Sequence, residues 1–256
     1  RNVVPKPVQK PHPPLWVACS NIQTIGQAGQ WGMGALGFTF VSPDAAQAWV
    51  HKYYNNLLHN QHKLTEYPAN PNIAMVSGFM CAETDEEAYE KASGWTFFIF
   101  ALSHYGRKGI GAPGEVNLWD EFQEWRYTEK AQKAFEGALI GSPETIRKKL
   151  RMFQDAHVDQ VILLNQAGKT SHEDICGSLK MFAEEVMPEF HGEEAAHAEW
   201  KRAVLAGDIV LEDLDVDKFD LYSHQNEDIV RLTPEQLKAQ MAAKEAAQKA
   251  EMAGDD

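Results

Sequence analysis

The most regular feature of the chain is a series of short apolar runs separated by longer amphipathic stretches. The runs cover residues 15–20 (LWVACS), 34–40 (GALGFTF), 72–81 (NIAMVSGFMC) and 158–164 (VDQVILL). A short and predominantly apolar run, in place of strict apolar–polar alternation, is typical of a parallel strand that is buried on both faces. The pattern therefore predicts four strands of a parallel sheet.

Each apolar run is followed by a stretch with residues that start helices. Side chains of Ser, Thr and Asn accept hydrogen bonds from the first free amides of a helix, and proline suits the first helical position. The predicted helices cover residues 21–31, 43–63, 143–156 and 171–187, and one more begins after Thr84, which forms a capping-box pattern with Glu87. The other caps that we expect are Ser20 or Asn21, then Ser42 before Pro43, and Ser142 before Pro143. Strands that alternate with helices indicate four βα units.

Three segments stand outside this alternation. Residues 104–117 (HYGRKGIGAPGEVN) are glycine-rich, and an aromatic helix through Trp119, Phe122, Trp125 and Tyr127 follows, so we expect an insertion over about residues 104–140. Residues 191–256 are acidic and end in an alanine- and charge-rich stretch, which favours a surface helix with a frayed end over an interaction tail. Residues 1–14 are proline-rich and start without methionine, and we expect that a segment upstream is missing.

Composition narrows the classes of function. The formal net charge of -13 argues against a nucleic-acid partner, because phosphates would be repelled. No apolar run reaches the ~18 residues that a membrane span needs, so we expect no membrane association. The three cysteines show neither a CxxC pair nor zinc spacing, so we predict no metal site and a reducing, cytoplasmic location.

Two segments resemble the bacterial luciferase-like flavin-dependent monooxygenases. The first is PKPVQKPHPPLWVACS at residues 5–20, which is similar to the family's proline-rich lead-in and fifth strand. The second is GSPETIRKKLRMFQDAHVDQVILL with the later SLKMFAEEVMPEF, which is similar to the last helix, eighth strand and closing helix. The resemblance covers about residues 3–190. It implies a TIM (β/α)₈ barrel of which residues 1–190 supply the last four βα units, with residues 191–256 as a helical extension.

The resemblance also implies a cofactor site. The family holds the phosphate of FMN near the carboxyl end of the fifth strand, where free amides of the following helix can bind an anion. The candidate cofactor-binding residues are Val17, Ala18, Cys19, Ser20, Asn21, Gln23, Thr24 and Phe38. Val17 and Ala18 would lie beneath the flavin edge, and Phe38, with Phe40, could wall the ring. The alternative is that Ser20 and Asn21 only cap their own helix, and that Cys19 and the phenylalanines are core residues.

By the same resemblance, the expected function is an FMN-dependent monooxygenase that oxygenates a small, apolar organic substrate with O₂. A separate NAD(P)H-dependent flavin reductase would supply the reduced FMN, the aromatic insertion would cover the site, and the protein would be a homodimer. The insertion could equally be a helix on the outside of the barrel. An F420-dependent oxidoreductase, a non-catalytic flavin-binding half-barrel and a barrel enzyme of another chemistry remain alternatives. The resemblance places the catalytic histidine in the first half of the barrel, so no catalytic residue is predicted here.

Overall fold

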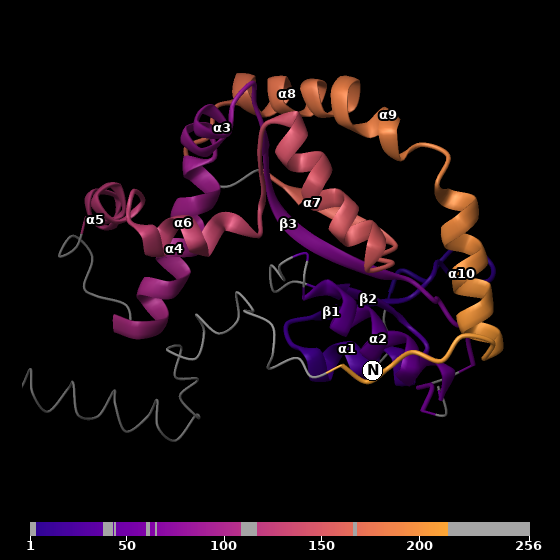
Figure 1. Ribbon diagram of the computed structural model, residues 1–256. Coiled ribbons are helices and arrows are strands. Elements are labelled where there is room, and N and C mark those ends of the chain that lie inside the picture. The colour runs from indigo at the N-terminus through magenta and orange to yellow at the C-terminus, as the bar shows by residue number, and fades with distance from the viewer. Residues whose placement is uncertain are drawn as a thin grey trace, which may run out of the picture.

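A computed structural model describes residues 4–37, 43, 45–59, 62–64, 66–108, 117–165 and 168–214. Its centre is a parallel sheet of β1 (Trp16–Cys19), β2 (Gly34–Gly37), β3 (Ile73–Cys81), β4 (Leu139–Gly141) and β5 (Gln160–Leu164). The strand order is β1–β2–β3–β4, and β5 also pairs with β3. Every pairing is parallel, so the predicted sheet type is confirmed (Figure 1).

Strand β3 organises the sheet because it is longer than its neighbours and buried along its whole length. Its first residues pair with β2, residues Ala74 to Gly78 pair with β5, and residues Phe79 to Cys81 pair with β4. The carboxyl end of β3 thus extends past the end of β2 and pairs there with β4. Strand β4 was not predicted, since a three-residue strand is too short to show any period.

The helices are α1 (Ile22–Trp31), α2 (Ala46–Leu58), α3 (Asp85–Lys91), α4 (Ser93–Lys108), α5 (Leu118–Trp125), α6 (Glu129–Glu136), α7 (Pro143–Asp155), α8 (His172–Met181), α9 (Met187–Phe190) and α10 (Glu194–Ala206). The cap of α1 is Asn21, and the predicted caps Thr84 and Ser142 are confirmed for α3 and α7. Each of these side chains accepts a hydrogen bond from the amide three residues on. Local capping chemistry therefore fixes where these helices begin.

Three predicted boundaries were wrong. The helix expected at residues 43–63 begins at Ala46, because the Ala46 amide bonds the Pro43 carbonyl in a turn, and it ends at Leu58; Ser42 lies outside the described residues. Helix α4 continues through residues 104–108, which were expected to be loop, while residues 109–116 are outside the described part. The closing helix is interrupted by one π-helical turn, η1 (Phe182–Val186).

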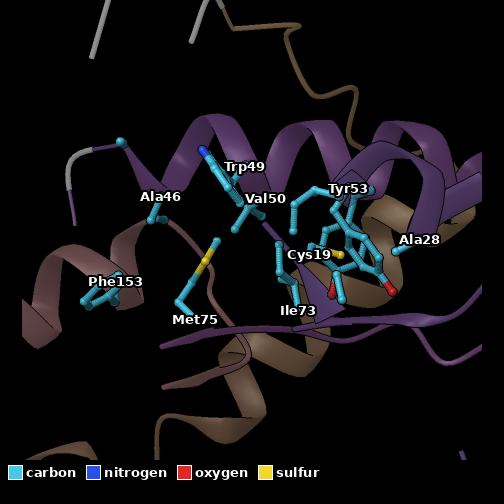
Figure 2. Packing of buried hydrophobic residues seen from close by; sticks show 14 of the residues in the cluster. Cys19, Ala28, Ala46, Trp49, Val50, Tyr53, Ile73, Met75 and Phe153 are labelled. Carbon is cyan, nitrogen blue, oxygen red and sulfur yellow. The ribbon is translucent and has the colours of Figure 1, made fainter. Parts of the chain in front are cut away.

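The main core lies between the sheet and the helices that follow its strands. Figure 2 shows Trp49, Val50 and Tyr53 of α2 directed toward the strands, where Ile73 and Met75 lie. Helix α1 approaches α2 closely at Gly29, where an added Cβ would lie 2.5 Å from the carbonyl oxygen of Tyr53. Burial of this apolar set at about 25 cal/mol per Å² supplies most of the energy that holds the helices on the sheet.

A second apolar cluster lies at the carboxyl end of β3. It joins Met80 of β3 with Trp95 and Ile99 of α4 and Phe135 of α6. Residue 78 must be glycine because any side chain would overlap the indole ring of Trp95. In Figure 1 the helices α4, α5 and α6 form a group to the left of the sheet, and the chain enters this group from β3 through α3 and returns from α6 to β4.

The described part of the extension, residues 191–214, folds back onto the sheet. Helices α8, α9 and α10 form an arc around the outside of the molecule (Figure 1). At its far end, α10 contacts α2 through Trp200 against Tyr54, and it contacts the residues just before β3 and β5 through Lys201, which bonds Asn72 and Asp159. Within the described ranges, no helix has both the length and the apolar character that a bilayer span requires.

Candidate functional site

The predicted cofactor site is the junction between β1 and α1, at the carboxyl edge of the sheet. Ser20 and Gln23 are exposed there, and Asn21 and Thr24 are half-buried. Carboxyl ends of parallel strands meet at one edge, and loops at this edge form the active sites of βα barrels. The structure thus brings the polar members of the predicted set together on one surface.

Asn21 and Thr24 are used to start α1. Asn21 Oδ1 accepts the Thr24 amide at 2.9 Å, and Thr24 Oγ1 accepts the Asn21 amide at 3.3 Å. This capping box leaves the amides of Ile22 and Gln23, which have no acceptor within the helix because they belong to its first turn. The expectation that Ser20 or Asn21 caps the helix is therefore met by Asn21, and Ser20 remains exposed.

The electrostatics at this helix start suit an anion. The first turn of α1 holds no acidic residue, so the positive end of the helix dipole is not compensated by a carboxylate. The amides of Ile22 and Gln23, which have no acceptor among the described residues, lie within three residues of the Ser20 hydroxyl and the Gln23 side chain. The Ile22 amide was absent from the predicted set; its place directly after a cap of the form Asn-x-x-Thr was the signal that could have identified it.

The three residues at the end of β1 face different ways. Cys19 is fully buried, its Sγ donates to the carbonyl oxygens of Val17 at 3.3 Å and Thr24 at 3.4 Å, and burial raises the pKa of the thiol. Val17 packs against the same core, whereas Ala18 points to the opposite face and is exposed. Of this group, only Ala18 presents its side chain away from the helices that cover the sheet.

The phenylalanines predicted to wall the flavin ring cannot be placed, whereas the side chains of the neighbouring strand β3 can. Phe38 and Phe40 lie outside the described part of the chain. Met75 and Phe79 of β3 lie in the main core. Ser77 is also buried in β3. Its hydroxyl donates to the Gly78 carbonyl and accepts a hydrogen bond from the amide of Leu139 in β4.

The aromatic insertion packs against itself at the same edge of the sheet. Phe122 of α5 is fully buried against Phe97 and Phe100 of α4, with ring centroids 5.5 and 5.7 Å apart. Leu164, at the carboxyl end of β5, packs against the neighbouring cluster around Trp95. The insertion is thus anchored to the carboxyl ends of β3 and β5, the edge to which β1 contributes Ser20.

Comparison with known families identifies this arrangement. The model of the luciferase-like monooxygenases matches residues 1–160, which is more than half of the chain. The chain belongs to the luciferase-like monooxygenase family. The resemblance noted from the two sequence segments is thereby confirmed, and the β1–α1 junction lies inside the matched region.

Individual relatives are distant and longer. The chain is 26% identical to the uncharacterized protein YceB of Bacillus subtilis (strain 168) over 142 residues, which are 54% of this chain and 40% of YceB. The F420-dependent tetrahydromethanopterin reductase of Methanopyrus kandleri shares 20% identity at a TM-score of 0.50, covering 69% of this chain and 51% of the reductase. The oxygenating constituent of a diketocamphane monooxygenase from Pseudomonas putida, solved with FMN, shares 18% identity at a TM-score of 0.47, covering 69% and 49%.

The likeness to the reductase shows the fold: the parallel sheet and its helices correspond to about half of a luciferase-like TIM barrel. The chain spans 40% of the curated relative that it matches and about half of the two solved structures. Members of this family are oxidoreductases and monooxygenases.

Proposed function

We propose that the protein containing this chain is an FMN-dependent monooxygenase, and that the β1–α1 junction contributes to its phosphate site. The observation that carries the proposal is the free amide pair of Ile22 and Gln23 beside the exposed Ser20 hydroxyl, at the functional edge of a barrel of this family. Amides at a helix start are donors that need no rearrangement to bind phosphate oxygens. The residues present therefore fit the phosphate of a flavin nucleotide.

The residues at this junction would contribute to phosphate binding in different ways. Ser20 Oγ and the Gln23 side chain would donate to phosphate oxygens that the two amides do not reach. Thr24 would act indirectly, since its hydroxyl is engaged with Asn21 and keeps the helix start in place. Cys19 would contribute backbone only, because its thiol faces the core. Ala18, whose side chain faces away from the core, would support the flavin edge from below, as would Phe38, whereas Val17 packs against the core and would contribute backbone only.

When bound, reduced FMN would supply the electrons that activate O₂. The protein's share is to hold the flavin, orient a small apolar substrate and exclude water. The helices α4 and α5 at the carboxyl edge would provide the apolar cover. A separate NAD(P)H-dependent reductase would supply reduced FMN, and the working form would be a cytoplasmic homodimer.

The second candidate is an F420-dependent oxidoreductase of the same fold, which the similarity to the Methanopyrus kandleri enzyme favours. Both cofactors carry phosphate and would use the same helix start. Cofactor titrations therefore decide between the two. A protein that binds FMN tightly without oxygenating any substrate would instead be a flavin-binding half-barrel.

The test is a fluorescence titration of the protein with FMN, riboflavin and F420. FMN should bind more tightly than riboflavin, which lacks the phosphate. Ser20→Asp should weaken FMN binding about tenfold or more, because a carboxylate would face the phosphate, and should leave riboflavin binding unchanged. Gln27→Asp adds the same charge to an exposed position further along α1 and is the matched control. Equal affinities for FMN and riboflavin, or equal effects of the two variants, would refute the phosphate site.

A further inference from the structure

A cavity of about 730 Å³ lies at the opposite edge of the sheet from Ser20. It is bounded by α7, η1, α9, α10 and the first residues of β5. Phe153, Phe182 and Phe190 line it from three of these elements, and Val161 lines it from the strand. A volume of this size falls in the ~300–1,000 Å³ range of small-molecule sites. Because it faces the amino end of β5, it is separate from the proposed flavin site.

One end of the cavity carries histidines that are held in fixed positions. His197 Nε2 donates to Asp159 Oδ1 at 2.7 Å, and the His157 ring stacks on Trp200 with centroids 3.9 Å apart. Burial lowers the pKa of His157, so its ring is neutral near pH 7 and offers a hydrogen-bond acceptor. His157 also has a left-handed backbone, with φ of 59°, which is uncommon for a residue other than glycine.

The charge balance of the lining favours a cation. Arg151, the basic side chain on the wall, is engaged by Glu189 at 2.8 Å and by Glu193 at 3.8 Å. Asp155 and Glu194 also line the cavity, and within the described residues neither has an ion-pair partner. The lining therefore combines an apolar body with an excess of negative charge at its exposed rim. The net charge of -13 also attracts cations to the protein and repels anions.

We propose that this cavity binds an apolar amine. The alkyl or aryl part would lie among the three phenylalanines, and the ammonium group would lie toward Asp155 and Glu194. An apolar acid does not fit, because it would face these carboxylates and would have to displace Arg151 from Glu189. The site is independent of the proposed flavin site, and neither needs the other.

Calorimetric titration with three ligands of one chain length tests the charge preference: octylamine, octanol and octanoate. Octylamine should bind most tightly, octanol more weakly, and octanoate should show no measurable binding. Tighter binding of octanoate, equal binding of octanol and octylamine, or no binding of any of them would overturn the proposal. Flavin titration of the same sample reports on the other site separately.

Two sets of variants locate the binding. Ala196→Trp fills the cavity from α10 and should abolish octylamine binding, whereas Ala198→Trp places the same ring on an exposed position of that helix outside the lining. Asp155→Asn with Glu194→Gln removes the rim charge and should weaken octylamine about tenfold, with octanol unchanged. Equal binding to both tryptophan variants would mean that the amine binds elsewhere. Circular dichroism verifies that each variant is folded.

Discussion

Removing the carboxylate of Asp159 should cost more stability than removing any surface charge. The side chain is 4% exposed and joins three parts of the fold. It accepts the Ile73 amide at 2.7 Å, the Tyr54 hydroxyl at 3.0 Å and His197 Nε2 at 2.7 Å, and it also pairs with Lys201. The start of β3, helix α2 and helix α10 are thus tied to one carboxylate at the amino edge of the sheet.

The size of the effect follows from what each replacement leaves behind. Asp159→Ala leaves the Ile73 amide without its acceptor in a largely buried place and removes the counter-charge of Lys201, which keeps the Asn72 side chain as its acceptor; such a loss costs about 3–5 kcal/mol. Asp159→Asn keeps an oxygen that can accept the Ile73 amide, but it loses the charge and places an NH₂ group where His197 and Lys201 donate, so we expect a loss of about 1–3 kcal/mol. Asp208→Ala removes an exposed carboxyl just after α10 and should change the free energy of unfolding by less than about 0.5 kcal/mol.

Urea unfolding followed by circular dichroism measures all three variants. Burial would raise the pKa of Asp159, but the hydrogen bonds from His197, Lys201 and Ile73 outweigh burial and hold it below the usual 3.8. The stabilisation by the carboxylate is therefore complete above pH 3.8 and is lost as the pH falls through the lower native value. The gap between wild type and Asp159→Ala should narrow in that acid range. A loss below about 1 kcal/mol for Asp159→Ala at neutral pH would refute the view of Asp159 as a structural hub.

Four further substitutions test local features of the fold by urea unfolding. Ser142→Ala should cost about 1 kcal/mol, because the first turn of α7 loses its cap. Gly29→Ala should cost about 1–3 kcal/mol, since the new Cβ would lie 2.5 Å from the Tyr53 carbonyl oxygen, whereas Gly177→Ala meets nothing within 4 Å and should not destabilise. Because burial lowers the pKa of His157 from 6.5, wild type should lose stability as the pH falls below 6.5, and His157→Asn, which tolerates the left-handed backbone, should lose less. Equal pH dependence of these two proteins would contradict that assignment.

The features that the sequence predicted correctly are those set by neighbouring residues. Apolar runs identified β1, β2, β3 and β5, since a strand buried on both faces needs little polar surface. Three helices begin at side chains that bond an amide three residues further on, so the sequence pattern alone indicates the cap; these side chains are Asn21, Thr84 and Ser142. Ser20 to Thr24 form one continuous segment, so their proximity at the end of β1 could also be predicted from the sequence.

The features that were missed depend on partners far along the chain or on a shift in helix geometry. Helix α4 extends through the start of a glycine-rich stretch, where His104 is buried with its ring 6.0 Å from that of Phe100 and its Nδ1 3.6 Å from Glu121 of α5. The π turn η1 precedes Pro188, which has no amide to donate to the carbonyl four residues back. The Met187 amide reaches Phe182 instead, so the helix widens there.

The described part of the extension contacts the sheet through α10. The surface helix that composition favoured over an interaction tail rests largely on residues 215–256, which lie outside the described part, while three side chains of α10 reach the sheet. His197 and Lys201 bind Asp159, and Trp200 stacks on His157 and meets Tyr54 at a ring distance of 5.4 Å. Asp159 and His157 lie at the end of the matched family region, while α10 lies beyond it. The extension thus packs along the amino edge of the sheet, on the opposite side from Ser20 and the first-turn amides of α1, which lie at the carboxyl edge.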